Sequence, residues 1–122
     1  MAFLTKDNLD DFFAAYAKPG VSDIHLMSNQ IPRVRDQGKV ITVSGFEPIQ
    51  KGDMEKIVEA LLSNKGRVEL SEHGSTDSSY QTQKHRFRLN VSMVYDPVQG
   101  SHTGLQLSAR ILSESIPLLS EL

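Results

Sequence analysis

The chain has 122 residues, which is enough for one domain with a single hydrophobic core. The apolar fraction of 39% argues against a disordered protein, and the formal net charge of -2 gives no overall attraction to nucleic acid or to an anionic membrane. The absence of cysteine excludes disulfides, thiolate metal sites and thiol nucleophiles. Because no stretch has the pattern of a signal peptide or a membrane span, we expect a cytoplasmic protein.

Two amphipathic helices are predicted in the first half of the chain. Apolar residues recur at helical spacing over residues 6–17, with Thr5 as the predicted N-cap. The same period returns from Asp53 onward, and its apolar face consists of Met54, Ile57, Val58, Leu61 and Leu62. We expect residues 64–66 to end this second helix and residues 67–73 to add a further helical turn.

Short alternating runs predict the strands of an antiparallel sheet. These runs cover residues 22–28, 33–36, 39–44, 75–82, 86–95 and 105–111. The turn before the third run is Gln37-Gly38, and the polar run 75–82 is predicted at a sheet edge. The last two runs should pair as a hairpin. The fold class is therefore predicted as α+β, with helices flanking an antiparallel sheet.

Arginines concentrate in these predicted strands. Five of the six lie there, on the face opposite the apolar set: Arg33, Arg35, Arg86, Arg88 and Arg110. Guanidinium groups suit phosphate and carboxylate, so neighbouring strands would give a basic sheet face. The simpler interpretation is a solvated face whose arginines pair with Asp23, Asp36 and Asp77. Asp23 and His25 share one strand face and are expected to be structural, because no further ligands for a metal are apparent.

Four blocks of sequence together resemble one known family. The blocks are Gly20-Val21-Ser22-Asp23-Ile24-His25-Leu26 followed by Pro32, Arg35 and Gly38, then Thr76-Asp77-Ser78-Ser79-Tyr80, then Arg86-Phe87-Arg88-Leu89-Asn90, and then Arg110-Ile111. In this order they resemble the N-terminal domain of the PilT-like pilus-retraction and type II/IV secretion ATPases. That family usually has an acid or Asn directly before the turn glycine, where this chain has Gln37.

The resemblance implies a domain arrangement. Residues 1–114 would be a PAS-like N-terminal domain, and residues 115–122 would begin a linker to a RecA-like ATPase domain that is missing here. The full-length protein would use ATP and Mg²⁺, neither of them bound tightly by this fragment. Its partners would be its own ATPase domain, neighbouring subunits of a homo-hexamer, and inner-membrane platform or secretion components. The machine would stand in the cytoplasm, peripheral to the inner membrane.

The resemblance also assigns candidate nucleotide-binding residues. Arg110 is the best-matched arginine to reach the phosphates, with Arg86 and Arg88 as weaker candidates. Each would act electrostatically. The sequence contains no phosphate-loop motif and no identifiable catalytic residue, so the chain itself is not assigned an enzymatic activity. Pilus retraction, pilus extension, secretion and conjugation remain equally open.

Two alternatives belong to other functional classes. A free-standing PAS-like module could bind a ligand or partner through a pocket on its apolar sheet face. Nucleic-acid binding through the arginines is the weaker alternative, because Phe87 lies on the opposite strand face from Arg86 and Arg88 and offers no stacking platform beside them. We therefore expect no direct nucleic-acid partner.

Overall fold

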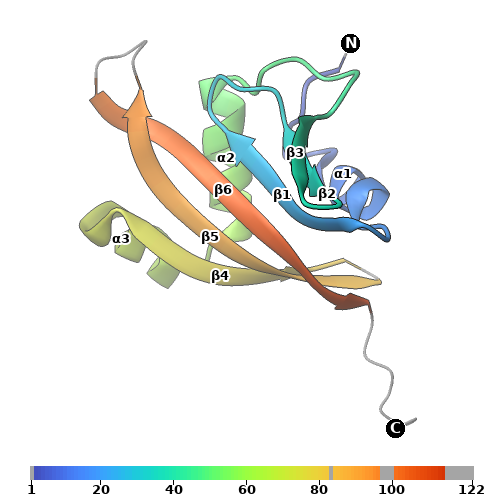
Figure 1. The fold of residues 1–122 in the computed structure, drawn as a ribbon. Helices are drawn as coiled ribbons and strands as arrows, with labels where there is room; N and C mark the ends of the chain where they lie inside the picture. The colour runs from blue at the N-terminus through green and yellow to red at the C-terminus, as the bar shows by residue number, and fades with distance from the viewer. Residues whose placement is uncertain (1, 83, 97–100, 115–122) are drawn as a thin grey trace, which may run out of the picture.

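A computed structural model describes residues 2–82, 84–96 and 101–114 of the chain (Figure 1). The helices are α1 Leu9–Tyr16, α2 Lys51–Leu61 and α3 Asn64–His73. The strands are β1 Val21–Met27, β2 Arg33–Asp36, β3 Lys39–Thr42, β4 Ser75–Gln81, β5 His85–Asp96 and β6 Ser101–Glu114. The predicted linker 115–122 lies outside the described residues.

All six strands form one sheet in the order β3-β2-β1-β6-β5-β4, and every neighbouring pair is antiparallel. The α+β class, the β5–β6 hairpin and the edge position of β4 are thereby confirmed. The sheet consists of two meanders, β1-β2-β3 and β4-β5-β6, joined along β1 and β6. The first and last strands of the described residues thus meet at the centre of the sheet. The narrower PAS-like assignment stays a prediction.

One face of the sheet carries the hydrophobic core. In Figure 1 α1 and α2 lie behind the sheet, and their buried side chains include Phe12, Phe13, Met54 and Ile57. The sheet contributes the buried residues Ile24, Leu26, Val34, Phe87, Leu89, Val91, Leu107 and Ala109. This alternation of buried and exposed positions is the strand period read from the sequence. No helix in the described part of the chain is long and apolar enough to cross a membrane.

The boundaries of α1 and α3 differ from the prediction. Helix α1 begins at Leu9, because the side-chain oxygen of Asn8 accepts a hydrogen bond from the Thr5 backbone N–H at 2.8 Å and holds a turn ahead of the helix. Thr5 is therefore not its N-cap. Residues 64–66 begin α3 instead of ending α2, because the Ser63 hydroxyl caps the new helix by accepting from the Gly66 N–H at 3.2 Å.

The β2–β3 turn places a side chain in an unfavourable backbone region. Gln37 and Gly38 have φ angles of 52° and 85°, as in a two-residue hairpin turn of type I′. Asn tolerates this left-handed conformation better than Gln. We expect Gln37→Asn to raise the free energy of unfolding by up to about 1 kcal/mol, as measured by urea denaturation. Gln37→Val, which adds β-branching, should lower it; equal midpoints for both variants would contradict this account of the turn.

Candidate functional site

The sheet face opposite the core gathers the strand arginines. Arg33, Arg35, Arg86, Arg88 and Arg110 alternate along their strands with buried residues, and we call the surface that they share the arginine face. No helix of the described residues lies over it in Figure 1. The strand order makes β2, β1, β6 and β5 consecutive, so arginines from both ends of the chain occupy one surface. The basic sheet face that the sequence suggested is therefore present.

The strand register aligns part of this face into a single row. Asp23 on β1 lies opposite Arg35 on β2 and opposite Arg110 on β6. Arg110 in turn lies opposite Arg88 on β5. Side chains directly opposite one another on antiparallel strands have Cβ atoms about 4.5–5.5 Å apart, which allows them to interact. We call Arg35, Asp23, Arg110 and Arg88 the arginine row.

Asp23 is the anion within the arginine row. Its Oδ1 accepts from Arg110 Nε at 3.4 Å, and its Oδ2 lies 3.5 Å from Arg35 Nε. The Ser22 hydroxyl also donates to Oδ2, at 3.3 Å. The Asp23 side chain is only 14% exposed, whereas that of Arg110 is 71% exposed. The pairing of arginines with Asp23 that the simpler interpretation predicted is thus confirmed for Arg35 and Arg110.

The three predicted phosphate-contacting residues are close in the fold but have different neighbours. Arg110 and Arg88 are cross-strand neighbours, so two guanidinium groups project from adjacent positions. Arg86 lies two residues before Arg88 on β5 and is opposite Gln81 on the edge strand β4. All three are exposed. Of the three, Arg110 therefore has the most defined surroundings, because the Asp23 carboxylate lies beside it.

A second row runs parallel to the arginine row and contains His25. Its imidazole Nδ1 lies 3.3 Å from the Ser108 hydroxyl on β6, and Arg33 on β2 lies opposite His25. Burial lowers the pKa of His25 below its usual 6.5, and the charges of Arg33 and Arg35 lower it further, while Asp23 acts against them. His25 therefore favours its neutral form in the folded state, which agrees with the structural role expected from the sequence.

The lowered pKa of His25 predicts a pH dependence of stability. Between the folded pKa and 6.5 the unfolded chain binds more protons than the folded chain at this position. The free energy of unfolding should therefore fall as the pH decreases through this window. We expect His25→Gln to lose less stability than the wild type between pH 7.5 and about pH 5, as measured by urea denaturation. Parallel pH profiles for the two proteins would contradict the prediction.

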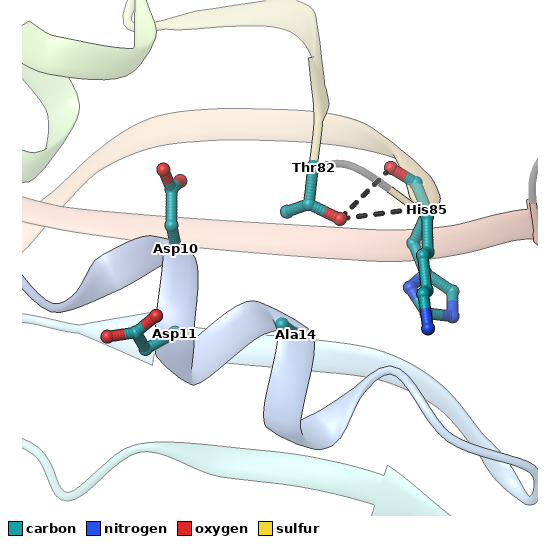
Figure 2. A pocket seen from close by; sticks show the side chains of 6 residues that line it. Asp10, Asp11, Ala14, Thr82 and His85 are labelled. Atoms are coloured by element: carbon teal, nitrogen blue, oxygen red, sulfur yellow. Dashed lines mark hydrogen bonds between the residues drawn. The ribbon is translucent and has the colours of Figure 1, made fainter.

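A metal site is not found among the residues that the structure describes. A surface hollow of about 520 Å³ lies between α1 and the β4–β5 turn. Ala14 and five polar residues line it: Asp10, Asp11, Thr82, Lys84 and His85. The Thr82 hydroxyl accepts from the His85 backbone N–H at 3.2 Å, and Figure 2 shows the two carboxylates well apart from the imidazole. These groups do not converge on a common point, so the hollow has no evident chemistry.

The apolar sheet face, on which the alternative of a free-standing module places a ligand pocket, is packed against helices in the described part of the chain. The inward side chains of the central strands, including Phe87, Leu89 and Leu107, have no exposed surface and are covered by α1 and α2. The hollow beside α1 lies between that helix and the β4–β5 turn, and its lining includes the charged residues Asp10, Asp11 and Lys84. The structure therefore gives no support to an apolar binding pocket within this sheet.

Comparison with solved structures gives strong matches over almost the whole chain. The pilus retraction motor PilT, solved with bound ADP, is 29% identical with a TM-score of 0.72, and the match covers 98% of this chain and 32% of that protein. The ATPase DotB of Legionella pneumophila is 14% identical with a TM-score of 0.79, covering 99% of this chain and 32% of that one. The Yersinia pseudotuberculosis ATPase DotB is 23% identical with a TM-score of 0.66, covering 88% and 29%.

These matches confirm the resemblance to PilT-like pilus and secretion ATPases that the sequence blocks indicate. For the two DotB proteins the likeness is one of fold, whereas PilT also shares more than a quarter of the aligned residues. The chain spans about a third of the length of each solved protein. No protein-family model matches the sequence, and no curated protein matches it either.

Proposed function

We propose that this chain is the N-terminal domain of a hexameric ATPase that powers a type IV pilus, a type II or type IV secretion system, or conjugation. The match to PilT over 98% of the chain is the observation that carries the proposal. Residues 1–114 would form the domain, and residues 115–122 would begin the linker to a RecA-like domain that holds the phosphate loop. The domain would contribute subunit contacts and couple nucleotide state to movement of the motor.

In this proposal the arginine face serves the nucleotide. Arg110 would reach the phosphates of ATP bound with Mg²⁺ by the ATPase domain, and Arg88 and Arg86 would add weaker attraction. The exposed Arg110 side chain and its contact with Asp23 through Nε alone support this role, because that contact does not use the two terminal guanidinium nitrogens. A guanidinium offers phosphate a planar fork of donors and stabilises its charge without making or breaking bonds.

The partners follow from the same proposal. The domain would pack against its own ATPase domain and against neighbouring subunits of a homo-hexamer. The assembled motor would work in the cytoplasm, peripheral to the inner membrane, against platform or secretion components. The fold likeness to PilT and to the DotB ATPases supports the assignment to a motor of this class.

The proposal is tested by the gene and by its product. The reading frame beyond Leu122 should encode a Gly-x-x-x-x-Gly-Lys-Ser/Thr phosphate loop within a few tens of residues, and the encoded protein should hydrolyse ATP as a hexamer. A stop codon directly after Leu122 in the native gene would contradict the proposal. So would a longer product that neither assembles nor hydrolyses ATP.

A further inference from the structure

Asp23 occupies the centre of the arginine row. Strand β1 lies between β2 and β6, so a single carboxylate on β1 reaches arginines on both sides. One oxygen accepts from Arg110 and the other lies against Arg35, at 3.4 Å and 3.5 Å. With 14% of its side chain exposed, Asp23 is much less accessible than either arginine, at 71% and 44%. It is therefore a largely buried anion beside two more exposed cations.

The form of these contacts leaves the terminal nitrogens of Arg110 available to a ligand, whereas Arg35 Nη1 donates to the Gly38 carbonyl at 3.2 Å. Both contacts join Asp23 to an Nε atom, the innermost nitrogen of the guanidinium group. Both are also longer than the usual 2.7–3.2 Å for a hydrogen bond of this type. Contacts of this kind restrain the plane of the guanidinium without holding it tightly. In Arg110 the two terminal nitrogens take no part in the contact with Asp23.

We propose that Asp23 is a positioning residue for Arg110. The proposal rests on the phosphate role of Arg110 given above. Asp23 restrains the Arg110 guanidinium plane through Nε, so that the terminal nitrogens are presented to phosphate oxygens. The Asp23 charge, shared with Arg35, also reduces the positive potential of the arginine row in the absence of nucleotide. Asp23 thus orients the Arg110 side chain and at the same time weakens the unspecific attraction of anions to the arginine row.

Substitution of Asp23 by asparagine should separate these two effects, because the amide keeps the shape of the side chain and removes its charge. Loss of orientation should lower kcat of the longer ATPase by about tenfold. Removal of the anion makes the row more positive, so KM for ATP should fall by about twofold. A misfolded fraction would lower the apparent kcat without lowering KM, so the split between the two constants identifies the positioning effect.

The geometry can be tested first in this chain, without any activity. In proton–nitrogen NMR spectra of the arginine side chains, Asp23→Asn should shift the Nε–H signals of Arg110 and Arg35 and speed their exchange with water. The matched control is Asp77→Asn, since Asp77 lies on the same sheet face and accepts from Asn90 Nδ2 at 2.9 Å. This control should leave both signals unchanged. An Arg110 signal that Asp23→Asn does not alter would overturn the positioning role.

Activity tests the consequence. In an Arg110→Ala background, Asp23→Asn should lower kcat by less than about twofold, because the residue on which Asp23 acts is already gone. Equal losses in both backgrounds would overturn the inference. Asp23→Glu retains the charge and should recover most of the kcat that Asp23→Asn loses; no recovery would contradict the proposal. A fully active Arg110→Ala variant overturns the phosphate contact itself, whereas unchanged Nε spectra overturn only the positioning by Asp23.

Discussion

In the full-length ATPase that we propose, substitution of Arg110 by alanine is expected to lower the rate of ATP hydrolysis by about 10²–10³-fold. A positively charged side chain that meets the phosphates stabilises the charge that develops there in the transition state, and removal of one such donor commonly has an effect of this size. The fold should be unaffected, because the Arg110 side chain is 71% exposed and its ion pair with Asp23 is of the surface kind. Steady-state hydrolysis assays with the purified full-length protein measure the effect.

Two further variants sharpen this test. Arg110→Lys keeps the charge but loses the planar fork, so its rate should fall between those of the wild type and the alanine variant. Arg67→Ala is the control of the same residue type: Arg67 lies on α3, where it donates to the Glu59 carbonyl at 3.3 Å, away from the arginine face. Its rate should remain within about twofold of the wild type. Full activity of Arg110→Ala would remove this residue from the nucleotide site.

Replacement of Phe87 by alanine should have the largest effect on stability. The side chain has no exposed surface, and its ring centroid lies 4.9 Å from that of Phe13 on α1. The substitution would leave a cavity between the sheet and α1, at a cost of about 3–5 kcal/mol. Domains of this size are typically stable by only about 5–15 kcal/mol, so the substitution removes a large share of the free energy of unfolding. Urea denaturation followed by circular dichroism measures the change.

Met93 provides the matched control, since it lies on the same strand and on the same side as Phe87 but is 37% exposed. Met93→Ala should cost about 1 kcal/mol or less. Phe87→Leu keeps most of the buried volume and should fall between the two alanine variants. Similar midpoints for Phe87→Ala and Met93→Ala would mean that Phe87 is not part of the principal core.

Local pattern was sufficient for most of the elements, and its failures have local causes. The alternation in β5 and the helical period in α2 are long and regular, so both elements were predicted within a few residues. Helix α3 was predicted only in part, because it buries little besides Leu70 and its cap resembles the end of α2. The start of α1 was placed too early, because Thr5 and Asn8 bond to one another.

The candidate site depended on information that the sequence does not carry locally. Alternation places each arginine on the outer side of its own strand, and this much was predicted. Which strands are neighbours, and in what register, depends on long-range pairing between β1 and β6. Only this pairing brings Asp23 beside Arg110, and it turns a residue that the sequence suggested was merely structural into the central anion of the row. Arg35, matched only as part of a sequence block, acquires its role in the same way.

The central position of β1 and β6 has a consequence for how the domain is made. Asp23 and Arg110 are 87 residues apart in the chain, and their strands pair directly. During synthesis the β1-β2-β3 meander leaves the ribosome first, and the edge of β1 that pairs with β6 stays unpaired until β6 has been synthesised. Such long-range pairing slows folding. A nascent chain that stops before β6 carries neither the closed sheet nor the complete arginine row. Completion of the sheet and of the arginine row therefore depends on the synthesis of β6.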